Sequence, residues 1–179
     1  MKKLIALALA FLTTNLFAQQ FTLTSSDLQG QLTNTQVFAG FGCAGENISP
    51  QLAWSNAPEG TKSFAITVYD PDAPTGSGWW HWVMFNIPVS VNELTANAGN
   101  LESGLAPDGS IQSTTSFGTT GYGGACPPEG DKAHAYIFTV FALSIDKMEL
   151  ESNAPPAMVG YYLNANVIEK ASIISYYKR

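Results

Sequence analysis

The sequence is poor in charge, and above all in positive charge. Lysine and arginine supply only eight of its 179 residues, against 14 acidic residues, and charged residues make up 12% of the chain. No run of basic residues offsets this balance. Nucleic-acid binding depends on neutralising backbone phosphates, so we expect no nucleic acid among the partners.

Long hydrophobic runs are also missing after the N-terminus, where none approaches the roughly 18 residues that a membrane-spanning helix needs. Residues 1–18 join Lys2 and Lys3 to a short apolar stretch and a final Ala18, the pattern of a secretory signal peptide; an uncleaved anchor is the alternative. Cleavage after Ala18 would leave residues 19–179 as one domain with a net charge of −8. The sequence predicts a periplasmic or secreted bacterial protein without a transmembrane segment.

Signatures of several catalytic classes are absent too. The chain has no G-x-S-x-G or H-E-x-x-H motif and no P-loop ending in Gly-Lys-Ser/Thr. A metal site from Asp70, Asp72, His81 and His134 is chemically possible, but no recognised ligand spacing supports it. We expect no metal, no cofactor and no enzyme; the alternative is a hydrolase that uses Asp70 or Asp72 with His81.

Cysteine is scarce, with only Cys43 and Cys126 in the chain. An even pair in an exported protein predicts a disulfide. The chain-entropy estimate for a bridge between residues roughly 80 positions apart is about 4 to 5 kcal/mol, as an upper value. The alternative is Cys126 as a nucleophile with His134 as its base.

Hydrophobic patterning predicts a mostly β domain. Strands are expected over residues 21–25, 51–55, 63–69, 81–87, 111–117, 136–143 and 171–177. Helical spacing occurs only over residues 157–168, after two prolines that suit a helix start. Since there is neither a repeat nor a linker, we expect one mostly antiparallel β domain with one or two C-terminal helices.

The stretch 69–86, YDPDAPTGSGWWHWVMFN, groups carboxylates, an imidazole and three indoles. Asp70 and Asp72 follow one apolar strand, and His81 begins the next. The other histidine, His134, also begins an apolar strand, so neighbouring strands would bring both imidazoles to one end of the sheet. We expect a carboxylate to orient His81 through a hydrogen bond; the alternative is a proline turn with two solvated aspartates.

A loop rich in glycine and proline precedes the second histidine. Gly123, Gly124 and Ala125 are small, so their backbone N–H groups could approach and cradle an anion. Pro127 and Pro128 forbid the helix that follows a nucleotide-binding P-loop. A plain connecting loop is the alternative.

Four motifs together give the sequence a family resemblance: DPDAP at 70–74, WWHW at 79–82, GACPP at 124–128 and H-x-Y at 134–136. With them, the chain resembles the phosphatidylethanolamine-binding protein family, which includes the Raf kinase inhibitor proteins, and in particular its bacterial YbhB/YbcL-like branch in an exported form. The resemblance runs from about residue 21 to the C-terminus.

The resemblance implies a β-sandwich with a small cavity for phosphate-like and phospholipid head-group anions. The cavity residues it implies by position, together with the loop glycine, are Asp70, Asp72, Pro74, His81, Gly124, Ala125, Pro127, Pro128, His134 and Tyr136. Cys126 stands where eukaryotic members have glycine, and Ala135 replaces a basic residue. These departures argue against the kinase-binding role of the eukaryotic members.

We therefore expect an exported, non-enzymatic binding module for a small anion, phosphate or phosphoethanolamine-like, with modulation of an unknown protein partner as a second role. An inhibitor of a protease or kinase is a further alternative. Nearby carboxylates should keep His81 protonated to higher pH. Anion binding should then strengthen as the pH falls from about 8 toward 6.

Overall fold

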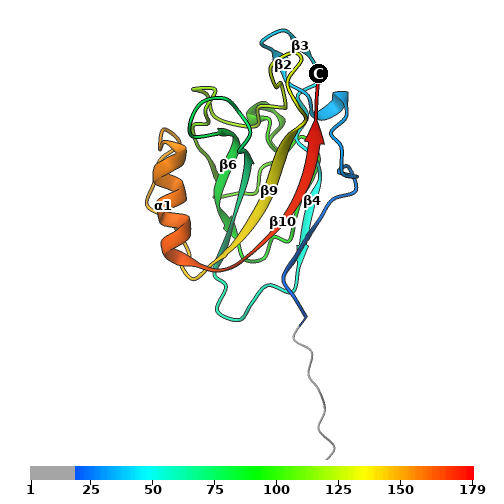
Figure 1. Cartoon of the computed structure of the whole chain (residues 1–179). Helices are drawn as coiled ribbons and strands as arrows, with labels where there is room; N and C mark the ends of the chain where they lie inside the picture. Colours follow the sequence, from blue (N-terminus) through cyan, green and yellow to red (C-terminus); the bar gives the residue numbers. More distant parts are fainter. Residues whose placement is uncertain (1–18) are drawn as a thin grey trace, which may run out of the picture.

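The computed structural model describes residues 19–179, so the predicted signal peptide lies outside the described residues. None of the helices among residues 19–179 is long and apolar enough to cross a membrane. Two antiparallel β-sheets and one α-helix form the body of the domain (Figure 1).

The larger sheet has five strands in the order β10-β9-β5-β6-β8. Its strands are β5 (Ser63–Asp70), β6 (Trp79–Pro88), β8 (Ile111–Gln112), β9 (His134–Leu143) and β10 (Val167–Tyr177). The central strand β5 pairs antiparallel with both β6 and β9, so its C-terminal end lies beside the N-terminal ends of both neighbours. This arrangement places one end of each strand at a common site.

The smaller sheet covers the inner face of the larger one. It has three antiparallel strands in the order β1-β4-β7, namely β1 (Thr22–Thr24), β4 (Leu52–Ser55) and β7 (Glu93–Leu94). The main hydrophobic core lies between the two sheets, with Trp54 of β4 and Phe64 of β5 packed edge to face at 5.3 Å. The predicted antiparallel sandwich is confirmed.

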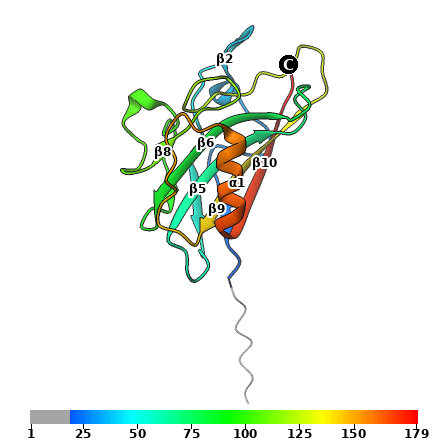
Figure 2. The same cartoon turned by 90° about the vertical axis from the view of Figure 1, so that its left-hand side faces the viewer.

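The one α-helix within residues 19–179, α1 (Pro156–Asn166), covers the other face of the large sheet (Figure 2). Val159 and Leu163, one turn apart, are its buried side chains, and they join a second core cluster with Phe85 and Phe141. Because both faces of β5 are covered, its side chains are buried almost continuously rather than alternately. The helix ends before the predicted residue 168, since the β-branched Val167 already begins β10.

Short elements occur within the long segments for which the sequence predicts neither a strand nor a helix. The segment 26–50 contains a 3-10 turn, η1 (Asn34–Gln36), and a small hairpin of β2 (Ala39–Gly40) and β3 (Cys43–Ala44). A second 3-10 turn, η2 (Leu101–Ser103), lies in the connection between β7 and β8. The hairpin and the C-terminus lie together at the top of Figure 1.

Several predicted strands have different limits in the structure: β9 begins two residues before the predicted residue 136, and β10 begins four residues before the predicted residue 171. The strand expected over 111–117 is only two residues long, because the chain turns back at once and Thr114 bridges to Thr120. In contrast, β6 begins two residues early, since Trp79 and Trp80 pair with Asp70 and Tyr69 of β5. The Gly/Ser segment 71–78 is therefore the tip of a hairpin.

Candidate functional site

A pocket of about 170 Å³ opens where β5 ends and β6 and β9 begin. It is lined by Phe41, Asp70, Ala73, Pro74, Thr75, Trp79, His81, Phe117, Cys126, Pro127, Pro128, His134 and Tyr136. The antiparallel order of the strands brings these residues together, as the placement of the two histidines at strand starts predicted. Most of the lining is apolar, and its titratable side chains are Asp70, His81, His134 and Tyr136.

Asp70, the last residue of β5, is buried and fully hydrogen-bonded. Its Oδ1 accepts from the backbone N–H groups of Asp72 and Ala73, at 2.8 and 3.1 Å, and its Oδ2 lies 2.8 Å from Nδ1 of His134. The carboxylate thus shapes the hairpin tip and orients His134. The expectation that an aspartate orients His81 is wrong, because β9 rather than β6 presents its imidazole to Asp70.

His134 lies between two carboxylates. Its Nδ1 donates to Asp70, and its Nε2 donates to Oδ2 of Asp131 at 3.2 Å. Burial alone would lower the pKa of His134, but the hydrogen bonds to Asp70 and Asp131 outweigh it and raise the pKa above its usual value. Both ring N–H groups are thereby engaged within the protein.

His81 has the opposite environment. Its Nδ1 lies 2.7 and 3.1 Å from the carbonyl oxygens of Gly123 and Gly124, so this nitrogen carries the proton and donates. Burial lowers the pKa of His81 to about 4, against the favourable effect of these carbonyls and of Asp70. The expectation that carboxylates keep His81 protonated is therefore wrong. The ring is neutral, and its Nε2 has no protein partner among residues 19–179.

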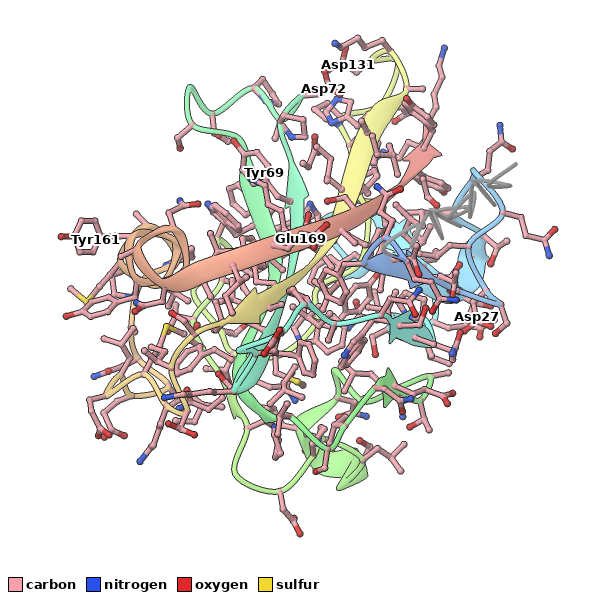
Figure 3. The ribbon with its side chains drawn as sticks, turned by 90° about the horizontal axis from the view of Figure 1, so that it is seen from below. Asp27, Tyr69, Asp72, Asp131, Tyr161 and Glu169 are labelled. Atoms are coloured by element: carbon pink, nitrogen blue, oxygen red, sulfur yellow. A yellow bond between two sulfur atoms is a disulfide. The ribbon has the colours of Figure 1, made fainter. Side chains whose placement is uncertain are left out.

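Asp72 faces away from the pocket. Its Oδ1 lies 2.6 Å from Nζ of Lys132, and its Oδ2 accepts from the Ala135 N–H at 2.9 Å. The hydrogen bond from Lys132 and that from Ala135 lower the pKa of Asp72. Asp72 and Asp131 lie at the same end of the molecule (Figure 3). Asp72 therefore ties the hairpin tip to the start of β9 instead of lining the cavity.

The pairing that the alternative hydrolase needs, His81 with Asp70 or Asp72, is not assembled in this geometry. His81 is hydrogen-bonded to carbonyl oxygens, whereas Asp70 is bonded to His134 and Asp72 to Lys132. Within residues 19–179, no group of three or more His, Cys, Asp or Glu side chains is arranged to hold a metal ion.

The prediction that the N–H groups of residues 123–125 bind an anion is wrong, because all three donate to acceptors within the protein. The N–H of Gly123 donates to His81 O at 2.8 Å, that of Gly124 to Asn47 Oδ1 at 2.7 Å, and that of Ala125 to Gln36 O at 3.3 Å. These amides are used to pack the loop against its neighbours, and Ala125 is buried in the main core.

Gly124 is required by close packing rather than by a ligand. A Cβ atom at Gly124 would overlap the carbonyl oxygen of Gln36. The next residue that borders the pocket is Cys126, and none of the hydrogen bonds among residues 19–179 uses its N–H. Among residues 123–126, this amide is the one without a protein acceptor.

Tyr136 supplies a second free donor. Its hydroxyl is buried in the lining and has no hydrogen-bond partner among the described residues. Its ring meets that of His81 edge to face at a centroid distance of 5.1 Å. Burial raises the pKa of the Tyr136 phenol, so the group stays protonated and can donate.

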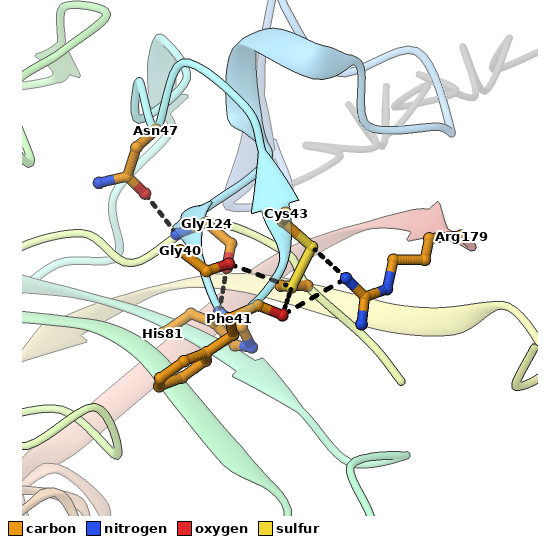
Figure 4. Close-up of a disulfide and its surroundings, with 8 residues drawn as sticks. Gly40, Phe41, Cys43, Asn47, His81, Gly124 and Arg179 are labelled. Atoms are coloured by element: carbon orange, nitrogen blue, oxygen red, sulfur yellow. Dashed lines mark hydrogen bonds between the residues drawn. A yellow bond between two sulfur atoms is a disulfide. The ribbon is translucent and has the colours of Figure 1, made fainter. Parts of the chain in front are cut away.

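The predicted disulfide between Cys43 and Cys126 is confirmed (Figure 4). It fastens the β2–β3 hairpin to the pocket loop. Arg179 adds to this link, with its Nη1 3.4 Å from both the Phe41 carbonyl oxygen and Cys43 Sγ. The alternative, in which Cys126 is a nucleophile with His134 as its base, is excluded because the Cys126 sulfur is bonded to Cys43.

Three aromatic residues, Phe41, Trp79 and Phe117, form a wall of the pocket. Trp79 belongs to the WWHW motif that predicted a pocket wall, whereas motif reasoning did not assign Phe41 and Phe117 to the site. Phe41 and Phe117 stack at a centroid distance of 5.7 Å, and Trp79 meets Phe117 edge to face at 5.4 Å. The predicted disulfide could have placed Phe41, since it lies two residues before Cys43. Phe117 had no comparable signal, because the sequence predicted it only as the end of the strand over 111–117. Trp82 is a core residue, and its Nε1 donates to Gln112.

Comparison with known proteins identifies a family and two similar bacterial proteins. Residues 16–178 match the phosphatidylethanolamine-binding protein family. The UPF0098 protein YbcL of Escherichia coli strain K12 is 52% identical over 177 residues, covering 98% of this chain and 97% of YbcL. The UPF0098 protein YbhB of the same organism is 50% identical over 155 residues, covering 84% of this chain and 96% of YbhB.

A solved structure has the same architecture. The crystal structure of E. coli YbcL, described as a new member of the mammalian PEBP family, matches with a TM-score of 0.88 and 53% identity, covering 90% of this chain and 99% of that one. Family match, sequence identity and fold agree over nearly the whole chain. The chain therefore belongs to the phosphatidylethanolamine-binding protein family.

Proposed function

We propose that this protein is an exported binding protein that holds a small phosphate-type anion in the pocket between His81 and the 126–128 loop. The observation that carries the proposal is the pair of free donors at the pocket. The buried Tyr136 hydroxyl and the Cys126 N–H have no protein partner among residues 19–179. The Tyr136 hydroxyl is buried, and a buried donor without a partner is costly. Cys126 is half-buried, and oxyanions accept hydrogen bonds from such donors strongly.

The size of the cavity limits the ligand. At about 170 Å³ it is smaller than the cavities of roughly 300 to 1,000 Å³ that hold drug-sized molecules. A phosphate or a phosphoethanolamine-like group has the right scale, whereas acyl chains would have to remain outside. The apolar rings of Phe41, Trp79 and Phe117 exclude water around the bound group and strengthen its hydrogen bonds.

Export is the second part of the proposal. The signal-like pattern of residues 1–18 supports it, as does the Cys43–Cys126 disulfide, since such bonds persist in oxidising compartments. We expect the pocket to function in the periplasm or outside the cell.

Titration of residues 19–179 with inorganic phosphate and with phosphoethanolamine, followed by NMR at pH 6, tests the binding site. We expect saturable shifts of the Cys126 N–H and the Trp79 indole N–H. Tyr136→Phe should weaken binding about five- to tenfold, the usual effect of losing one hydrogen bond to a charged group.

Tyr161→Phe is the matched control, because it removes the same hydroxyl from an exposed position on α1 (Figure 3). Its affinity should equal that of the unmodified protein. Shifts that map away from the pocket, or equal affinities for Tyr136→Phe and the control, would contradict the proposal.

A further inference from the structure

We propose that this pocket selects oxyanions that carry a proton, namely phosphate monoesters as monoanions, through His81 acting as a hydrogen-bond acceptor. The inference rests on the proposed function, because it concerns the same ligand site. It assigns the specificity of that site to Nε2 of His81.

The tautomer of His81 follows from its contacts. Two carbonyl oxygens, of Gly123 and Gly124, converge on Nδ1 at 2.7 and 3.1 Å, and only a protonated nitrogen satisfies them. Nε2 of the neutral ring then carries a lone pair and no hydrogen. Burial keeps the ring neutral above about pH 4. A ligand atom beside Nε2 must therefore donate a hydrogen bond.

The charges around His81 support the same selection. Asp70 faces it from β5, while His134 and Tyr136 lie on β9, and the Tyr136 phenol is protonated. When His134 is protonated, its charge is paired with both Asp70 and Asp131. The lining contains neither lysine nor arginine. One imidazolium cannot neutralise both the Asp70 and the Asp131 carboxylates, so this end of the pocket repels a dianion more strongly than a protonated monoanion, which carries less charge.

These features define a complementary ligand. Two of its oxygens would accept from the Tyr136 hydroxyl and the Cys126 N–H, and a P–O–H group would donate to Nε2 of His81. A phosphate monoester has this group when its second proton is bound, with a pKa of about 6. The phosphodiester of an intact phospholipid lacks it. The geometry thus favours a free phosphate monoester over an intact lipid head group.

A comparison at pH 5.5 isolates the proton. Methyl phosphate and methyl sulfate then have nearly the same charge and size, but only methyl phosphate carries a P–O–H. Calorimetric titration of residues 19–179 should show methyl phosphate binding at least tenfold more tightly. Dimethyl phosphate, a diester without the proton, represents the intact lipid and should bind as weakly as methyl sulfate.

Raising the pH removes the proton from the ligand. Between pH 7 and 8 the affinity for methyl phosphate should fall by about tenfold, because the monoanion is lost above its pKa of about 6. Methyl sulfate does not titrate in this range. The pH dependence of methyl sulfate binding therefore measures any effect of His134 or its carboxylate partners. The ratio of the affinity for methyl phosphate to that for methyl sulfate then isolates the effect of the ligand proton.

His81→Asn provides the test of the residue. The asparagine amide can replace Nδ1 as a donor to Gly123 O, but no atom replaces Nε2. The preference for methyl phosphate should therefore disappear, with affinities for the two ligands within about threefold. If this variant does not fold, the affinity ratio of the unmodified protein and its pH dependence decide the question.

Each outcome separates the two proposals. Equal affinities for methyl phosphate and methyl sulfate would overturn the role of His81 but leave the anion site standing. Dimethyl phosphate binding as tightly as methyl phosphate would overturn the selection and indicate an intact head group as the ligand. If none of the three binds, the proposed function fails and this inference fails with it.

Discussion

His81 and His134 lie at the same site but respond to pH in opposite ways. Burial lowers the pKa of His81 to about 4, from an unfolded value of about 6.5. Its contribution to stability is present above pH 6.5 and is lost as the pH falls toward 4. The pKa of His134 is raised, since its bonds to Asp70 and Asp131 outweigh burial. The contribution of His134 to stability is present below pH 6.5 and is lost as the pH rises through the pKa of His134 in the folded protein.

We therefore expect the free energy of unfolding to be greatest near pH 6.5. Between pH 6.5 and 4.5, titration of His81 alone should remove about 2 kcal/mol. Urea unfolding at pH 4.5, 6.5 and 8.5 measures this profile. In His81→Asn the loss on the acid side should shrink, because asparagine does not titrate, while the loss on the alkaline side should remain. An acid side equally steep in both proteins would show that other groups dominate.

At the scale of elements, the pocket depends on a contact between the β2–β3 hairpin and the loop that precedes β9. The Cys43–Cys126 bond joins residues 83 positions apart, and Cys126 and Phe41 both line the pocket. Neither short strand of the hairpin could hold this position by its own pairing, since each has only two residues. The disulfide therefore positions one wall of the site.

Reduction of this disulfide should lower the free energy of unfolding by about 2 to 5 kcal/mol, because it frees a long loop in the unfolded chain. It should also weaken phosphate binding, since Phe41 and the Cys126 N–H lose their fixed positions. Urea unfolding and phosphate titration with and without reductant measure both effects. A Cys43→Ser/Cys126→Ser variant is the control, because reductant should not change it. Unchanged stability of the unmodified protein in reductant would contradict the prediction.

At the scale of the whole molecule, the low content of basic residues has a consequence for the site. Residues 19–179 carry a net charge of −8, so the long-range field of the protein repels anions. A pocket for anions must then bind through short-range hydrogen bonds. Added salt should therefore raise the affinity slightly, because it screens this repulsion, whereas it weakens binding to proteins that attract anions through basic patches.

Export can be checked on the same scale by intact mass spectrometry of the protein recovered from the periplasm or medium. We expect a chain that begins at Gln19, because the signal pattern ends at Ala18. Without prior reduction, it should take up no alkylating agent, because both cysteines are bonded. Retention of residues 1–18 would indicate an uncleaved anchor.

Much of the fold could be predicted from local patterns. The β-branched and aromatic residues of 63–69 and 136–143 predicted the two central strands, and the prolines at 155 and 156 predicted the helix start. Strand limits were less accurate. Trp79 and Trp80 are strand residues because they pair with β5 across a tight hairpin, which no pattern within residues 71–80 specified.

The site was predicted as a set of residues but not as a set of contacts. Asp70, Pro74, His81, Pro127, Pro128, His134 and Tyr136 line the pocket as expected, whereas Asp72, Gly124 and Ala125 hold the surrounding loops. Sequence proximity favoured an Asp70–His81 pair, since both lie on one hairpin. The partner of Asp70 is instead His134, some 60 residues away in the chain.

By itself, the sequence determined the composition-level and local features of this protein: a poorly charged, mostly β chain, a disulfide pair and two histidines at strand starts. Those depend on residue types and short spacings, which a linear chain displays. Only the tertiary structure decided the protonation of each histidine, because a pKa depends on burial and on the partner that packing supplies. Packing buried His81 and placed His134 between two carboxylates, and so lowered the pKa of the first imidazole and raised that of the second.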